Sequence, residues 1–381
     1  MTRLKTILLL LFITCSPLTL AFDASDTRVK DMVLSSAIAT QQLKFTVILP
    51  EGYDPKDKQR YPVFYTQTDS RRMKLIAQQI DWLSHLDFGP IPQMIIVTLP
   101  YVELPQENQH KDAVASGMAT PLTISVLKKE LLPYIDNHFK TQPFRIIEGY
   151  STQANLPLGI LATQPQLFNA YISISPALEL DKSGLLNALE HNLPKHNVRY
   201  RSVFASLGSF TNNKPLFDQL SKTLAKAQPA LNSQLVDFSH INYYTTPVTA
   251  LPQALEALFK DRSPQDIQKF SQQGYSAVLQ YFKQLKNKYG YMMSPVTTLV
   301  DLAQYQLAQG SNHQAMQTLT HVVKLKPDSI YYLTLLASAQ QKTQQKTAAK
   351  QSLDTALQLA IKTKNPGEID YVKSQIDALN H

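Results

Sequence analysis

The residues of this sequence best suited to chemistry are 149–153, Gly-Tyr-Ser-Thr-Gln, which carry Ser151 at their centre. They follow a short apolar run at 144–147 and precede a helical run. A serine on a sharp strand-to-helix turn presents its hydroxyl outside the sheet, and the next helix offers N–H groups to an oxyanion. The pattern therefore predicts nucleophilic attack by Ser151. Its usual form ends in glycine, where this chain has Gln153, so the motif alone is weakly specific.

The elements that must position Ser151 alternate between strand-like and helix-like runs over residues 22–260. Leu43–Leu49 alternates apolar and polar residues, which is typical of a half-buried strand. Further short apolar runs predict strands at 63–65, 94–97, 144–147, 170–175, 202–207 and 234–238. Helical spacing occurs at 71–86, 127–139, 215–224 and 251–259. This order predicts an α/β fold, with a mostly parallel sheet covered by helices on both faces.

From residue 263 onward the sequence contains helical runs and no strand. Small residues recur with a period of 34 in the pairs Ala303/Ala337 and Ala315/Ala349, which is the spacing of a tetratricopeptide unit. We therefore predict an α/β domain at 22–262 and a helical tail at 263–381. The tail would hold two tetratricopeptide-like repeats, at about 296–329 and 330–363. An ordinary helical appendage is the alternative interpretation.

The first 21 residues have the features of a secretory signal peptide. Arg3 and Lys5 form a charged start, residues 7–13 are apolar, and Thr-Leu-Ala at 19–21 supplies small residues for cleavage. The apolar stretch is too short to cross a bilayer, and no later run is long enough. We therefore expect export across the inner membrane, a periplasmic location, and no integral membrane segment after cleavage.

Composition excludes several classes of function. The apolar fraction is 44% and charged residues are 17%, which excludes a disordered chain. The net charge is +8, but Lys and Arg are scattered singly, so nucleic acid is not an expected partner. The only cysteine, Cys15, lies in the leader, which excludes disulfides and thiolate zinc sites in the mature chain. No metal-ligand spacing or nucleotide-binding loop occurs, so we expect neither metal nor cofactor. Trp82, on a helical run, is expected in the core.

Several further segments resemble the putative esterase family, which includes the enterochelin-esterase-like and esterase-D-like α/β-hydrolases. The segments are 49–53, 61–63, 130–136, Arg145, 165–171 and Ser175-Pro176. The likeness covers about residues 35–260. It implies an α/β-hydrolase fold with Ser151 as nucleophile for a carboxylic ester, and the family also carries tetratricopeptide-like helices behind its hydrolase domain.

The same resemblance exposes two missing partners of the serine. The family has its triad acid shortly after the strand that is 202–207 here, but residues 208–213 read Gly-Ser-Phe-Thr-Asn-Asn. It has its histidine in a stretch like His-x-Thr-Thr-Pro, and the matching residues 243–247 begin with Tyr243. A phenol with a pKa of about 10 is a poor general base at neutral pH.

Three more departures concern the oxyanion side and the helix after the serine. The family's second glycine after the elbow is Ala154 here, and the last residue of the loop at 67–69 is Asp69 where the family has glycine. That carboxylate is expected where an oxyanion should bind. Pro157 is expected to remove one N–H from the helix that follows Ser151.

The first hypothesis is therefore a degenerate hydrolase that binds a small ester-like ligand, or a protein through its helical tail. Its pocket would be lined by Ser151 together with Tyr150, Thr152, Tyr243, Tyr244, Thr68 and Asp69.

The alternative is an active serine carboxylic-ester hydrolase in which Ser151 uses His240 as its base. His240 precedes Tyr243 by three residues, and Asp237 or Asp218 would orient it. A third interpretation, a scaffold that acts through the tail alone, ranks last because two repeats are few for an independent groove.

Overall fold

The computed structural model describes residues 28–86, 88–103, 119–181, 183–227, 230–262, 264 and 266–380. The predicted leader at 1–21, with Cys15, lies outside the described residues. Among the described helices, none combines the length and apolar character that crossing a bilayer requires.

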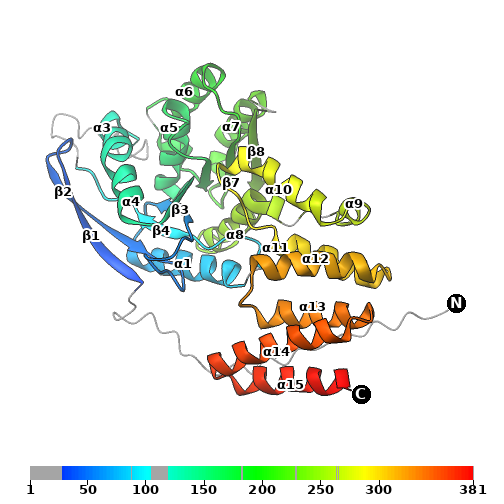
Figure 1. The fold of residues 1–381 in the computed structure, drawn as a ribbon. Helices are drawn as coiled ribbons and strands as arrows, with labels where there is room; N and C mark the ends of the chain where they lie inside the picture. Colours follow the sequence, from blue (N-terminus) through cyan, green and yellow to red (C-terminus); the bar gives the residue numbers. More distant parts are fainter. Residues whose placement is uncertain are drawn as a thin grey trace.

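Within the described residues, eight strands form one sheet in the order β1-β2-β4-β3-β5-β6-β7-β8 (Figure 1). The strands are β1 (Val29–Ser36), β2 (Gln41–Ile48), β3 (Tyr61–Thr66), β4 (Ile95–Thr98), β5 (Thr141–Tyr150), β6 (Ala170–Ile174), β7 (Arg201–Leu207) and β8 (Leu231–Asp237). Strands β3 to β8 are parallel, while β1 and β2 form an antiparallel ribbon at one edge. The prediction of a mostly parallel sheet is confirmed.

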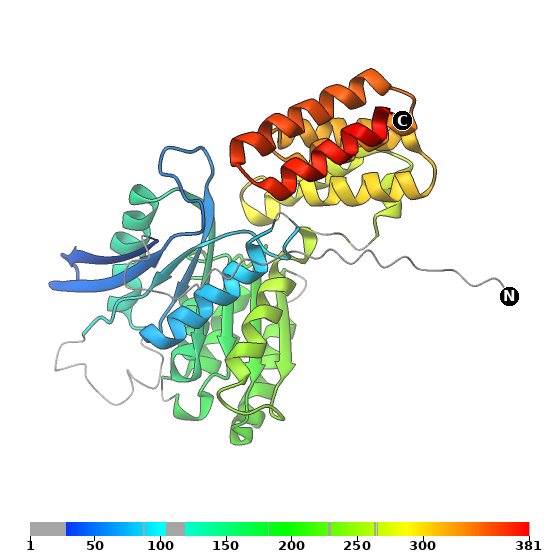
Figure 2. The same cartoon turned by 90° about the horizontal axis from the view of Figure 1, so that it is seen from below.

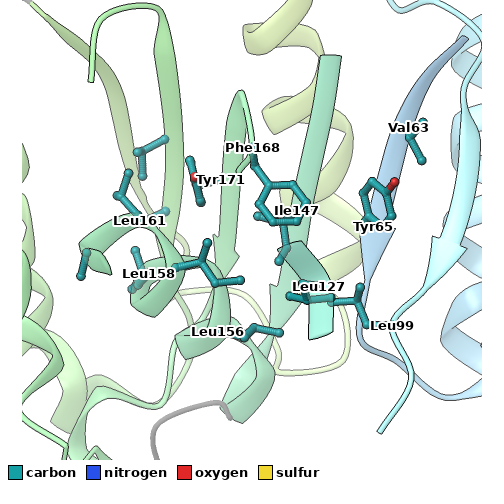
Figure 3. Packing of buried hydrophobic residues seen from close by; sticks show 14 of the residues in the cluster. Val63, Tyr65, Leu99, Leu127, Ile147, Leu156, Leu158, Leu161, Phe168 and Tyr171 are labelled. Atoms are coloured by element: carbon teal, nitrogen blue, oxygen red, sulfur yellow. The ribbon is translucent and has the colours of Figure 1, made fainter. Parts of the chain in front are cut away.

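Helices cover both faces of this sheet. The helices of the α/β part are α1 (Ser70–Ser84), α3 (Pro121–Val126), α4 (Leu132–His138), α5 (Asn155–Thr163), α6 (Leu185–Asn192), α7 (Lys214–Lys226) and α8 (Thr246–Phe259). Helices α3 to α7 pack on one face, where strand residues such as Val63 and Ile147 meet Leu158 and Leu161 (Figure 3). Helices α1 and α8 pack on the other face, against Phe64 and its neighbours. Because β3 is buried along its whole length, it faces both layers.

The C-terminal region is entirely helical in its described part. It comprises α9 (Gln268–Ser271), α10 (Tyr275–Tyr289), α11 (Val296–Ala308), α12 (Asn312–Leu325), α13 (Ile330–Lys342), α14 (Lys346–Thr363) and α15 (Pro366–Asn380). Helices α13 and α14 begin 34 residues after α11 and α12, respectively. The paired alanines, Ala303/Ala337 and Ala315/Ala349, are all buried between helices.

A hydrogen bond repeats with the same spacing. Thr318 Oγ1 donates to Gln306 Oε1 at 2.9 Å, and Ser352 Oγ donates to Gln340 Oε1 at 2.8 Å. Each bond joins the two helices of one pair, 34 residues from its counterpart. This supports an internal repeat, although its assignment as tetratricopeptide-like stays a prediction.

The helical region packs at the amino ends of the parallel strands. The ring of Phe144, early in β5, lies 5.6 Å from that of Phe259 in α8 and 5.3 Å from that of Tyr289 in α10. The Tyr289 hydroxyl donates to Leu258 O at 2.8 Å. The first helices of the tail therefore share one apolar core with α1 and α8. Since Ser151 follows the other end of β5, about 23 Å along the strand from Phe144, the tail leaves that edge uncovered.

We expect Tyr289→Ala to lower the free energy of unfolding by about 3–5 kcal/mol, because it removes a fully buried ring and leaves a cavity at this junction. Urea unfolding followed by circular dichroism would measure the change. The matched control is Tyr331→Ala on α13, where half of the side chain is exposed and the cost should stay within about 0.5 kcal/mol. Equal effects of the two changes would contradict a shared core.

Candidate functional site

Ser151 lies on a strained turn between β5 and α5. It begins the short helical turn Ser151–Ala154 and has a φ of 60°, in the left-handed region that serine seldom adopts. The turn is so tight that a Cβ at Gly149 would lie 2.1 Å from Gln153 O. Glycine is therefore required at 149, whereas the following helix tolerates Gln153 and Ala154.

The oxyanion side of the turn is formed by the start of this helix and by the loop after β3. The N–H of Thr152 lies in the first helical turn, where no partner within the helix is available. Across from it, Asp69 Oδ1 accepts the N–H of Arg72 at 2.8 Å and so caps α1. The carboxylate that we expected at the oxyanion position is thus engaged by a helix terminus, although Asp69 still lines the cavity.

Pro157 has less effect than its position in the sequence suggests. It is the third residue of α5, and an N–H there has no acceptor within the helix. The expectation that Pro157 breaks the helical ladder is therefore wrong, because a proline in the first turn removes no intrahelical bond.

Four aromatic side chains occupy the region where loops after β7 and β8 approach Ser151. Tyr243 has its ring 5.0 Å from Tyr150, 5.2 Å from Phe210 and 5.3 Å from Tyr244. We call these four residues the aromatic cluster. Tyr150 Oη donates to Tyr243 O at 2.6 Å. Burial raises the pKa of Tyr150 far above its ordinary value, so this phenol stays a neutral donor.

His240 lies apart from Ser151 in the described structure. Its side chain is exposed, it does not line the cavity onto which Ser151 opens, and it makes no hydrogen bond to another described residue. Its nearest carboxylate is that of Asp237, whose pKa is lowered mainly by hydrogen bonds from Ser239. Asp218 pairs with Lys214 at 3.0 Å. The described residues thus supply Ser151 with no imidazole partner.

The cavity beside Ser151 is wide, with a volume of about 1440 Å³. All seven residues predicted for the pocket line it: Tyr150, Ser151, Thr152, Tyr243, Tyr244, Thr68 and Asp69. Sequence analysis missed the opposite wall, which includes Asp31, Lys44, Thr46, Arg71 and Tyr101. Much of this wall belongs to the β1–β2 ribbon. It was missed because β1 is mostly exposed and has no apolar run to announce a strand.

A buried ion pair underlies the cavity, and it too was missed. Glu148 is fully buried at the end of β5, where it accepts a 2.7 Å hydrogen bond from Thr66 Oγ1 and a two-pronged contact from Arg72. The guanidinium of Arg72 lies 5.2 Å from the centre of the Tyr150 ring. Strand β3, strand β5, helix α1 and the aromatic cluster are thereby joined. An acidic residue ending an apolar strand was the available signal, because a buried carboxylate needs a partner.

Within the described residues, no group of three His, Cys, Asp or Glu side chains could hold a metal ion. The chemistry available at the cavity is therefore that of hydroxyls, backbone N–H groups, aromatic rings and a few charged side chains. Ser151 offers a nucleophile position, and the aromatic cluster offers surfaces for stacking.

We expect Arg72→Ala to lower the free energy of unfolding by about 3 kcal/mol, because it leaves Glu148 buried without its cation. The matched control is Arg71→Ala, whose exposed side chain lines the same cavity and should cost no more than about 0.5 kcal/mol. Denaturant unfolding of both variants would show the difference. Similar costs would mean that the ion pair does not hold the site together.

Comparisons with known proteins agree on the fold. A serine hydrolase from Shewanella oneidensis described as IroE-like matches with 21% identity and a TM-score of 0.62, covering 78% of this chain and 99% of its own. An uncharacterised protein from Capnocytophaga ochracea matches with 16% identity and a TM-score of 0.60, covering 92% of this chain and 99% of its own. A protein named BES from Bacillus cereus matches with 16% identity and a TM-score of 0.52 over 61% of this chain and 96% of its own.

No curated protein matches the sequence. The family model described as "Putative esterase" matches residues 35–234, which is more than half of the 381 residues. The match includes β5, the turn at Ser151 and the strands on either side of it. The resemblance carried by the motifs is thus supported by an independent match, and this chain belongs to the putative esterase family.

Proposed function

We propose that this protein binds a small ester-like ligand in the cavity beside Ser151 and has little or no ester-hydrolysing activity. The observation that carries this proposal is the aromatic cluster. Tyr243 and Phe210 make ring contact in the two loops from which a histidine and an acid would serve the serine. Without a base, the Ser151 hydroxyl is a weak nucleophile at neutral pH.

The walls of the cavity indicate what kind of ligand would fit. Tyr244 and Tyr101 are 81% and 62% exposed, so both rings are open to stacking. Two cations, Lys44 and Arg71, are balanced by two carboxylates, Asp31 and Asp69. This balance favours an uncharged ligand with both planar and hydrogen-bonding parts over a strongly anionic one.

Labelling with a fluorophosphonate tests the proposal, because this reagent reacts with activated serines. We expect labelling of the folded protein to equal that of Ser151→Ala, and turnover of a short-chain 4-nitrophenyl ester to stay at the background rate. Labelling and turnover that disappear in Ser151→Ala would overturn the proposal. Circular dichroism of both proteins would confirm that they are folded.

An active esterase is the second candidate, and one observation favours it. The left-handed φ of Ser151 is a strain of the kind that is retained at functional sites. If labelling depends on Ser151, loss of turnover in His240→Ala would identify the base, with Asp237→Asn as the test of its orienting acid.

Export belongs to the same proposal. We propose cleavage after Ala21 and a periplasmic location, with the helical tail available to a protein partner. Expression of the full chain in a bacterium with two membranes should release a mature form beginning at Phe22 into the periplasmic fraction. Intact-mass measurement would check it, and an uncleaved chain retained in the cytoplasm would contradict export.

A further inference from the structure

The helical region has one end at which many helix termini gather. Successive helices from α10 to α15 are joined by short connections and run antiparallel, so α10, α12 and α14 end where α11, α13 and α15 begin. The α12–α13 and α14–α15 connections lie together on the left of the helical region in Figure 1. We call this the basic end, for the lysines described below.

Exposed apolar side chains of the helical region are confined to the basic end. Between residues 266 and 380, the large apolar residues that the structure describes as exposed are Met292, Leu325, Tyr331, Ile361 and Tyr371, each 43–55% exposed. They lie in the α10–α11 connection, at the ends of α12 and α14, and in the first two turns of α13 and α15. Single exposed apolar residues are ordinary, but their concentration at one end marks an interaction surface.

Lysines are interleaved with these apolar residues. Lys324 and Lys326 flank Leu325, and Lys362 and Lys364 follow Ile361, all with exposed side chains. The helix dipole favours cations at helix C-termini, which explains lysines there. It does not explain why each pair accompanies an exposed aliphatic side chain.

The α/β part extends this surface. Helix α1 starts beside the cavity and runs back to the amino ends of the strands, where the helical region packs. At and beyond its end, Trp82 and Phe88 are 74% and 67% exposed. The expectation that Trp82 lies in the core is wrong: Ile80 faces the core, whereas Trp82 points outward and stacks on His85 at 5.1 Å. Figures 1 and 2 both show the end of α1 beside the basic end.

We propose that the basic end, together with Trp82 and Phe88, binds the surface of an anionic phospholipid bilayer. Lysines would contact lipid phosphates, while Leu325 and Ile361 would enter the boundary between headgroups and acyl chains. Tryptophan and tyrosine favour this interface because each has an apolar ring with a polar edge. The cavity lies at the opposite edge of the sheet, so it stays open to water when the protein is bound. This proposal does not depend on whether Ser151 is active.

Flotation of the mature chain with lipid vesicles tests the proposal. The chain begins at Phe22, so that the apolar leader cannot itself bind lipid. Vesicles of phosphatidylcholine alone are compared with vesicles that contain about one third phosphatidylglycerol, at about 0.1 M salt. We expect binding to the anionic vesicles only, and a loss of binding as the salt concentration rises.

Two variants separate charge from apolar contact. The change of Lys324, Lys326, Lys362 and Lys364 to Gln should weaken binding at least tenfold, because each lysine near the surface adds to the attraction. The double change Leu325→Gln and Ile361→Gln should reduce the binding that survives at high salt. The matched control changes Lys342, Lys346 and Lys350 to Gln at the other end, and should leave binding within twofold of the unchanged protein.

Three results would overturn the proposal. They are no binding to anionic vesicles, equal weakening by the control variant, and unchanged binding by the four-lysine variant. Light scattering gives a further test: a dimer that dissociates in the Leu325→Gln, Ile361→Gln variant would assign this surface to a second copy of the chain instead.

Discussion

The arrangement of the candidate site depends on a carboxylate that cannot be solvated. Glu148 is fully buried, so its charge is stable only if Arg72 and Thr66 stay in contact with it. Those contacts fix the start of α1 against the end of β5, and with it the loop that faces Ser151. They also place a cation over the ring of Tyr150. The geometry of the turn at Ser151 is therefore maintained by a structural ion pair and does not require the serine to react.

That independence explains how the shape of the site can outlast its chemistry. The tight turn needs Gly149 and the buried pair needs Glu148, and both are present. The loops after β7 and β8 contribute little to either requirement. In those loops Phe210 and Tyr243 make an aromatic contact that buries apolar surface between them. A histidine and an acid could be replaced there without loss of the fold, because ring packing stabilises the loops by another means.

Sequence patterns predicted the fold well, since both faces of the sheet are buried and short apolar runs mark the strands. They missed β1 because its side chains are mostly exposed, so neither alternation nor an apolar run reveals it. They placed Trp82 inward because helical spacing does not by itself decide which side of a helix faces the core. For the site, sequence named the residues near Ser151, but it could not supply the wall formed by β1 and β2 or the pairing of Glu148 with Arg72. Both depend on contacts between residues more than 70 positions from the turn or from each other.

The two exposed surfaces of the protein lie at opposite edges of one sheet, and the strands explain why. Ser151 and its cavity follow the carboxyl ends of β3 and β5, where loops of a parallel sheet converge. The helical region is attached at the amino ends, through the packing of Phe144 on Tyr289. A protein held at a surface through its tail would therefore present its cavity away from that surface. The rigid sheet between them separates the two roles, so a change at the basic end should alter where the protein resides and leave what the cavity binds unaffected.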